Sequence, residues 1–137
     1  KKSENFEPDT VVTLQNTSPF RNALHIDKAF TIFKKENYDS VISGFKSKFL
    51  LWEKKGKNII PINYNPLKRP RRQEIQKYFI ENGAIFITKY SSLKKFKSRV
   101  CGKVGLYEMP YENSLDIDNS FDLYLARQIF KFKEIKS

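Results

Sequence analysis

The spacing of apolar residues in the first third of the chain predicts a strand, a helix and a second strand. Residues 10–15, TVVTLQ, form a continuous apolar and β-branched run, which is typical of a strand buried on both faces. Residues 25–37 carry apolar side chains at helical spacing, and residues 39–45, DSVISGF, predict another strand. This order indicates a βαβ unit and therefore a parallel sheet. The apolar face of the helix consists of Ile26, Ala29, Phe30 and Phe33.

The remaining pattern predicts a hairpin followed by short alternating elements. Residues 48–65 contain two extended apolar segments around the turn KKGKN, which is typical of a β-hairpin. Further elements are predicted as a short helix at 74–79, a strand at 83–89, a short helix at 91–96 and a strand at 103–110. A last helix begins near Asn119 or Ser120, either of which can cap it. Its apolar stripe consists of Phe121, Tyr124, Leu125, Ile129 and Phe132.

Length and composition then limit the class of protein. A chain of 137 residues corresponds to one domain or a part of one, and it has no apolar run long enough to span a membrane. The N-terminus does not resemble a signal peptide, and the single Cys101 cannot form an internal disulfide. These features predict a cytoplasmic protein. The net charge of +11 favours anionic partners, although it is also typical of a lysine-rich solvated surface.

Several kinds of catalytic site are poorly supported by the residues present. One His and one Cys do not support a zinc cluster or a Cys–His dyad, and His25 is interpreted as a helix-start residue. Neither the GxxxxGK[ST] loop nor the GxGxxG loop occurs. Any phosphate must therefore be bound by another arrangement.

Two carboxylates just before the last helix are the most informative chemical feature. In an extended segment, Asp116 and Asp118 would point to the same face about 6.6 Å apart, with Ile117 anchored in the core. Two carboxylates with substrate phosphates form a suitable site for Mg²⁺. The alternative is that Asp118 only caps the helix that follows.

Three other stretches are candidates for ligand binding. Residues 14–21, LQNTSPFR, follow the first strand at its carboxyl end, where open α/β sheets bind ligands. Residues 69–73, RPRRQ, offer three guanidinium groups to phosphates or a carboxylate. Asn82 and Gly83 precede a strand, at a position where the backbone can approach a ligand closely.

Taken in order, these segments resemble the acylneuraminate cytidylyltransferases, the synthetases of CMP-sialic acid and related CMP-nonulosonic acids. The resemblance extends from about residue 10 to residue 130, and the ordered set of motifs is more specific than any one of them. The set consists of Leu14, Gln15, Thr17, Ser18, Pro19 and Arg21; Arg69 to Gln73; Glu81 to Ile85; Gly105 to Pro110; and Ser114, Asp116, Ile117 and Asp118.

The resemblance implies a nucleotidyl transfer. Members of the family join CTP to a nine-carbon 2-keto sugar acid and release pyrophosphate, with Mg²⁺ as cofactor. By this analogy Asp116 and Asp118 are the catalytic, metal-binding pair. The substrate-binding residues implied by the family motifs are Gln15, Ser18, Arg21, Asn82, Gly83, Phe86, Lys48 and Arg72. Gln15 matches a family glutamine that contacts the sugar acid, and Phe86 stands where many members have a tyrosine.

The same resemblance implies an oligomer and an incomplete domain. Lys48 and Arg72 match basic residues that the family donates across a dimer interface, so residues 45–72 are interpreted as a dimerisation arm of a homodimer. The family begins with a basic, glycine-containing nucleotide-binding loop, which is absent here. Residues 1–137 are therefore expected to be one cytidylyltransferase domain without its N-terminal part, inactive alone. Its first strands would also be missing, which would leave an apolar sheet edge uncovered.

The expected fold is α/β, a mostly parallel sheet of the nucleotide-diphosphosugar-transferase type with flanking helices and a projecting hairpin arm. The expected partners are CTP and a nonulosonic acid, with neither a membrane nor nucleic acid among them. Two other functions remain open at this point. A basic, aromatic-rich chain could be a nucleic-acid-binding module, which would show steep salt dependence of binding. The chain could also be a non-catalytic dimerisation fragment.

Overall fold

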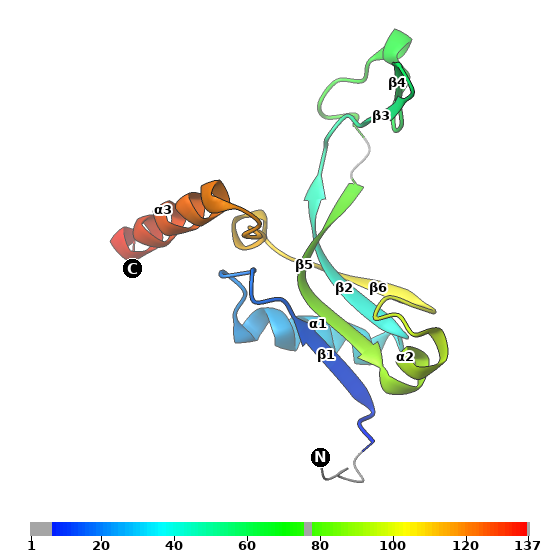
Figure 1. Ribbon diagram of the computed structural model, residues 1–137, viewed down its shortest axis with the longest axis vertical. Helices are drawn as coiled ribbons and strands as arrows, with labels where there is room; N and C mark the ends of the chain where they lie inside the picture. The colour runs from blue at the N-terminus through cyan, green and yellow to red at the C-terminus, as the bar shows by residue number, and fades with distance from the viewer. Residues whose placement is uncertain (1–6, 76–77, 137) are drawn as a thin grey trace. The chain divides into compact units, whose positions relative to one another are not determined.

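The computed structural model describes residues 7–75 and 78–136 and divides into two compact units (Figure 1). The first unit consists of Lys1–Phe45 and Glu81–Ser137, and the second of Lys46–Ile80. The second unit therefore contains nearly all of the expected arm at residues 45–72.

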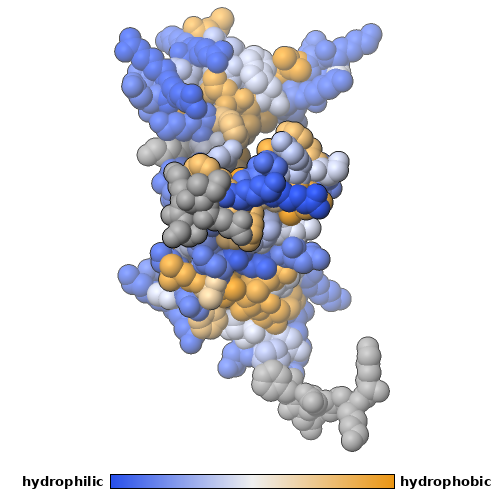
Figure 2. All heavy atoms as spheres, turned by 90° about the vertical axis from the view of Figure 1, so that its left-hand side faces the viewer, coloured by the Kyte–Doolittle hydropathy of each residue, from blue (hydrophilic) through white to orange (hydrophobic). Residues whose placement is uncertain are grey.

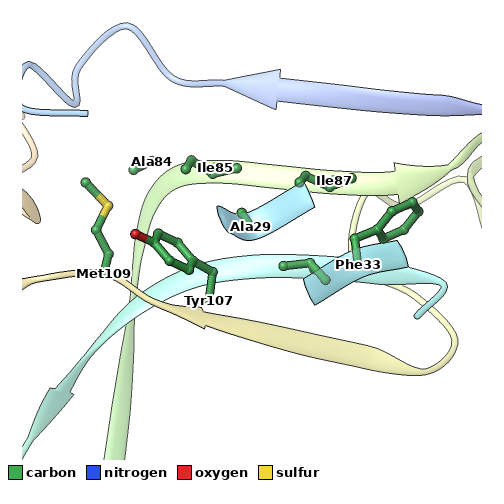
Figure 3. Packing of buried hydrophobic residues seen from close by; sticks show 8 residues of the cluster. Ala29, Phe33, Ala84, Ile85, Ile87, Tyr107 and Met109 are labelled. Atoms are coloured by element: carbon green, nitrogen blue, oxygen red, sulfur yellow. The ribbon is translucent and has the colours of Figure 1, made fainter. Parts of the chain in front are cut away.

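The first unit is built on a four-stranded mixed sheet. Its strands are β1 (Thr10–Leu14), β5 (Tyr78–Lys89), β2 (Ser40–Ser47) and β6 (Val104–Glu108), in that spatial order. β1 pairs with β5 in antiparallel fashion, and β2 pairs with β6 in parallel. Figures 1 and 3 show β5 running opposite to β2. The prediction of a mostly parallel sheet is thus only partly correct, because the reversed β5 lies between β1 and β2.

β1 differs from its prediction in burial. It lies at one edge of the sheet, and none of its five residues is buried. Val12 and Leu14 are each 40% exposed. The prediction that both faces are buried is therefore wrong, because an edge strand has one strand neighbour and the described residues cover its apolar side chains only in part.

The helix α1 (Ala23–Lys35) follows β1 and begins with a capping box. The Asn22 side chain accepts a hydrogen bond from the His25 amide at 3.1 Å, and the His25 Nδ1 accepts one from the Asn22 amide at 3.3 Å. Both interactions satisfy amides that the first turn of a helix leaves unpaired. The interpretation of His25 as a helix-start residue is therefore confirmed.

The core lies between α1 and the sheet (Figure 3). Apolar residues of α1, at positions four apart, pack on those of the three neighbouring strands. The fully or almost fully buried members are Ala29, Phe33, Val41, Ala84, Ile85, Ile87, Tyr107 and Met109. Burial raises the pKa of the Tyr107 hydroxyl. This core fixes β2, β5 and β6 relative to one another, and with them the ends of these strands.

The later elements agree with the sequence in part. α2 (Tyr90–Phe96) and β6 are confirmed, whereas the predicted helix at 74–79 is wrong. Its residues 76–77 lie outside the described part of the chain, and Tyr78 and Phe79 belong to β5. Short 3-10 turns at Pro66–Lys68 (η1) and Tyr111–Asn113 (η2) were not predicted.

The last helix, α3 (Ser120–Lys136), is confirmed, but much of its apolar stripe is exposed. Phe121 is 64% exposed, and Tyr124 and Phe132 are 56% and 57% exposed. Ala126, in contrast, is buried. No helix in the described part of the chain is long and apolar enough to cross a membrane.

The second unit contains the predicted hairpin, formed by β3 (Trp52–Lys55) and β4 (Asn58–Pro61). Gly56 has a φ of +62° in the turn, a conformation that glycine adopts without strain. Large apolar side chains of this unit reach the surface, and Figure 2 shows apolar residues in orange between hydrophilic residues in blue. The exposed apolar side chains are Phe49, Leu51, Trp52, Ile59, Ile60, Ile62, Leu67 and Phe79.

Candidate functional site

The loop between β1 and α1 is fastened to β5 by one arginine. The guanidinium of Arg21 donates from Nη1 to the carbonyl of Gln15 at 2.6 Å and to the carbonyl of Ala84 at 2.9 Å. Arg21 and Ala84 are 63 positions apart in the chain, so this bond joins the loop to a distant strand. Arg21 was predicted to bind substrate, but in this structure its guanidinium holds the loop that carries Gln15.

Gln15 lies directly against Gly83. Leu14 pairs with Ile85 across β1 and β5, so the chain continues past Leu14 towards Gly83. Gly83 has a φ of +67°, and a Cβ built on it would overlap the side-chain amide of Gln15. A residue with a side chain would therefore be strained and would also displace this amide. The structure brings together two predicted residues that lie about half of the chain apart in the sequence.

Asn82 lies at the centre of a buried hydrogen-bond network. Its side-chain oxygen accepts from the Ser43 hydroxyl at 2.6 Å, and its nitrogen donates to the Ser114 hydroxyl at 2.9 Å. The Ser43 oxygen also accepts from the Ile85 amide at 2.8 Å, and Ser114 donates to the Pro110 carbonyl at 2.8 Å. The network therefore joins β2, β5 and the segment after β6.

The segment that carries the aspartate pair runs beside the β1–α1 loop. The Ile117 amide donates to the Thr17 carbonyl at 3.0 Å, and the Asn113 side chain donates to the Phe20 carbonyl at 3.0 Å. Ile117 is bonded to Thr17, and the earlier residue Asn113 is bonded to the later residue Phe20. The segment after β6 and the β1–α1 loop therefore run in opposite directions. Asp116 is thereby brought to the level of Ser18.

The two aspartates differ in their surroundings. Asp118 is exposed, whereas Asp116 is half-buried and its Oδ1 makes no hydrogen bond within the described residues. Asp116 also lines a cavity of about 330 Å³ beside α3, together with Ser114, Phe45, Tyr111, Glu112, Leu115, Leu125 and Ile129. A buried carboxylate oxygen without a donor is suited to a cation or a hydrogen-bond donor brought by a ligand. Oδ1 of Asp116 is therefore available to a divalent cation, and the exposed carboxylate of Asp118 is open to solvent.

No described residues form a group of three or more His, Cys, Asp or Glu side chains that could hold a metal ion. A divalent cation bound by the aspartate pair would need its remaining ligands from water or from a bound phosphate.

The alternative role of Asp118 as the cap of α3 is wrong. The Asn119 side chain accepts from the Phe121 and Asp122 amides at 2.9 and 3.1 Å. The Asp122 carboxylate in turn accepts from the Asp118 and Asn119 amides at 3.0 and 3.1 Å. This reciprocal arrangement satisfies the first turn of the helix, so the Asp118 carboxylate is not needed for it.

The other predicted residues have different surroundings. The Phe86 side chain is 1% exposed and is covered by the Arg99 guanidinium, 3.9 Å from its ring centroid. Lys48 and Arg72 belong to the second unit, where the Lys48 ammonium donates to the Arg72 carbonyl at 3.2 Å. Together with Arg69 they line a hollow of about 340 Å³. The residues brought together in the first unit are Gln15, Ser18, Arg21, Asn82, Gly83 and Asp116.

Ser43 and Asp122 were not among the predicted functional or supporting residues, whereas Asn119 was one of the two caps predicted for the last helix. The sequence does indicate that Ser43 is hydrogen-bonded, because a serine inside a buried apolar strand is rarely found without a partner for its hydroxyl. The identity of its partner, Asn82, depends on the fold and could not be read from the sequence.

Comparison with known proteins relates this chain to cytidylyltransferases. It is 33% identical over 126 residues to N-acylneuraminate cytidylyltransferase A of Danio rerio and 33% identical over 128 residues to the N-acylneuraminate cytidylyltransferase of Oncorhynchus mykiss. The enzyme of Streptococcus agalactiae serotype III with the same name is 33% identical over 116 residues. These matches cover 89%, 90% and 81% of this chain but only 29%, 29% and 28% of the relatives. The resemblance found in the sequence motifs is thus confirmed.

A solved structure is similar to this chain in fold. The crystal structure of 4-diphosphocytidyl-2C-methyl-D-erythritol synthase from Anaerococcus prevotii matches with a TM-score of 0.59 at 15% identity, over 93% of this chain and 62% of that one. At this identity the match concerns the fold alone, a mixed α/β arrangement with a sheet and flanking helices. No protein-family model matches the chain.

The contact between Gln15 and Gly83 leads to a testable expectation. Gly83→Ala should lower the free energy of unfolding by more than Gly56→Ala, which serves as a matched control. Both glycines have positive φ, so both variants incur about 1–2 kcal/mol of backbone strain, but a Cβ at Gly56 meets nothing within 4 Å. Only Gly83→Ala should also shift the side-chain amide resonances of Gln15 in an NMR spectrum.

Urea unfolding gives the two free energies and the NMR spectra report on Gln15. Equal costs for the two variants, with unmoved Gln15 resonances, would show that the space above Gly83 is not confined by this side chain.

Proposed function

We propose that this chain, a relative of the N-acylneuraminate cytidylyltransferases, forms part of an enzyme that joins CTP to a nonulosonic acid. The observation that carries the proposal is the meeting of three matched motifs, around Gln15, Gly83 and Asp116, at one place in the first unit. The chain spans about 29% of the length of the relatives it matches. The activity, the substrates and a cytoplasmic location are therefore parts of the proposal.

In the proposed reaction, the anomeric hydroxyl of the sugar acid attacks the α-phosphorus of CTP. A new oxygen–phosphorus bond forms, the bond to the bridging oxygen of the β-phosphate breaks, and pyrophosphate leaves while the hydroxyl releases its proton. Such a reaction depends mainly on positioning and on stabilisation of developing charge. Gln15, seated on Gly83 and held by Arg21, is in a position to donate or accept hydrogen bonds to the sugar acid.

In this proposal Asp116 and Asp118 hold Mg²⁺. The unpaired Oδ1 of Asp116 and the exposed carboxylate of Asp118 leave both groups available for a cation, since Asn119 and Asp122 cap α3. When bound, Mg²⁺ neutralises charge on the phosphates. The net charge of +11 attracts both anionic substrates, but a cationic surface alone offers the cation no ligand. The acidic pair supplies this ligand.

The proposal includes a homodimer formed through the second unit. Its hairpin exposes several large apolar side chains, and exposed apolar surface of this kind is typical of interaction sites. Lys48, Arg69 and Arg72 surround a hollow in the same unit, where they present positive charge to an anion. In the proposed dimer, Lys48 and Arg72 serve the site of the partner subunit.

The activity test uses the product of the complete open reading frame that contains this chain. Incubation with CTP, Mg²⁺ and separate sialic, legionaminic and pseudaminic acids should release pyrophosphate with at least one of them, together with a CMP-linked product detected by mass spectrometry. A folded protein that is silent with every acid would contradict the proposed function.

The metal assignment predicts a separation of activity from stability. In the active protein, Asp116→Asn and Asp118→Asn should each lower turnover by about 100-fold or more, because the loss of even an outer group that orients a metal ligand costs about 10–100-fold. The melting temperature should stay within a few degrees, and residual activity should require more Mg²⁺. Asp27→Asn, an exposed aspartate on α1, is the matched control and should change neither quantity. Early melting with normal turnover would show instead that the pair is structural.

The dimer assignment predicts that Leu50→Asp with Ile60→Asp gives a monomer, because two charges would then lie in an apolar interface. Light scattering coupled to size-exclusion chromatography measures the mass. Lys57→Asp, in the turn of the same hairpin, changes charge without removing an apolar side chain and should remain dimeric. Survival of the dimer in the double variant would place the interface elsewhere.

A further inference from the structure

Two polar atoms of the first unit are buried without a hydrogen-bond partner in the described residues. They are the hydroxyl oxygen of Ser18, a residue only 4% exposed, and Oδ1 of Asp116. An unpaired buried polar atom destabilises a folded protein. By contrast, the buried hydroxyls of Ser40, Ser43 and Ser114 all make hydrogen bonds. The two unpaired atoms are thus exceptions, and a bound water or a ligand would satisfy them.

These two atoms come from segments that lie side by side. The Thr17–Ile117 and Phe20–Asn113 hydrogen bonds set the two segments in opposite directions. In this register the residue after Thr17 and the residue before Ile117 stand across from one another. Ser18 and Asp116 make no direct hydrogen bond, which leaves one hydroxyl and one carboxylate oxygen for a third group.

The chemistry of the pair restricts what this third group is. A carboxylate oxygen accepts hydrogen bonds or binds cations, and a serine hydroxyl both donates and accepts. A hydrated divalent cation satisfies both, because the ion binds the carboxylate while one of its oxygen ligands exchanges a hydrogen bond with the hydroxyl. An apolar ligand would satisfy neither group.

We propose that Ser18 is a positioning residue of the cation site, whose hydroxyl binds an oxygen ligand of the cation held by Asp116. The inference rests on the proposed function, since it takes Asp116 as a ligand of the cation. The same role explains why the Ser18 hydroxyl has no hydrogen-bond partner among the described residues. In the protein without cation, the Ser18 hydroxyl lowers stability, and in the protein with cation it strengthens binding. Outer groups of this kind typically change metal affinity by about 10–100-fold.

The test compares the same substitution at two buried serines of the 137-residue chain. Ser18→Ala removes an unpaired hydroxyl, so the melting temperature in EDTA should be unchanged or higher. Ser40→Ala removes a hydroxyl that donates to the Cys101 carbonyl at 2.8 Å and accepts from the Cys101 amide at 3.0 Å, so its melting temperature should fall by about 2–8 °C.

The second readout is the affinity for Mn²⁺, measured by paramagnetic broadening of amide resonances around Asp116. Ser18→Ala should weaken Mn²⁺ binding by about tenfold or more, whereas Ser40→Ala should leave it unchanged. Asp116→Asn is the third variant, and it should weaken binding at least as much as Ser18→Ala. A role in folding alone would not produce this opposite response of stability and affinity.

Three results would overturn the inference. If Ser18→Ala melts early, as Ser40→Ala does, its hydroxyl has a structural partner. If Ser18→Ala binds Mn²⁺ normally while Asp116→Asn does not, Ser18 has no part in the site, but the metal assignment stands. If Mn²⁺ does not broaden the resonances near Asp116, or Asp116→Asn binds normally, the metal assignment fails and the role of Ser18 fails with it.

Discussion

The hydrogen bonds of the Asn82 side chain hold the candidate site together. An amide offers two donors and an acceptor oxygen with two lone pairs, and Asn82 uses both ends. The Ser43 and Ser114 hydroxyls depend on it, and each of them in turn satisfies a backbone group. Without the amide, several buried polar atoms in three segments would lose partners, and each loss costs about 1–3 kcal/mol. The segment that leads to Asp116 is thus tied to the sheet through one side chain.

The reversed direction of β5 determines which motifs can meet. Because β5 runs opposite to β1, the entry to its buried half lies beside the carboxyl end of β1, where the Gln15 loop begins. Gly83 stands at this point, and its positive φ and lack of a side chain leave room for the Gln15 amide. In an all-parallel sheet, the carboxyl ends of two adjacent strands lie at the same edge. The contact between Gln15 and Gly83 instead requires the carboxyl end of β1 to lie beside an earlier part of β5, which only an antiparallel pair allows.

The sequence allowed most elements to be predicted, but little of their pairing. The helical spacing of residues 25–37 and the turn around Gly56 are local patterns, so α1 and the hairpin could be recognised. The apolar run at 10–15 indicated a strand, yet nothing local shows that it lies at the edge of the sheet. Likewise, the segment 74–79 has some helical character, but Tyr78 and Phe79 join β5 because tertiary pairing outweighs local preference.

For the site, motif similarity identified residues that the fold brings together, but it did not separate their roles. Gln15, Ser18, Asn82, Gly83 and Asp116 do gather in one region, whereas Phe86 is covered by Arg99. Arg21 was expected to bind substrate because it belongs to a matched family motif, yet its guanidinium donates to two backbone carbonyls. Likewise, the carboxylate of Asp118 seemed suited to cap α3, but Asn119 occupies that role. Such assignments depend on hydrogen-bond partners, which spacing along the chain does not encode.

The pattern of satisfied and unsatisfied groups separates the framework of the site from its binding groups. Asn82, Ser43, Ser114 and Arg21 have their partners within the chain, so a ligand would gain little from them. The Ser18 hydroxyl and Oδ1 of Asp116 are buried atoms that have no hydrogen-bond partner among the described residues. Because unpaired buried groups lower stability, their position next to a fully bonded network indicates a site prepared for a ligand. If the proposed Mg²⁺ binds there, the Asp116 carboxylate supplies the negative charge that a surface with a net charge of +11 does not.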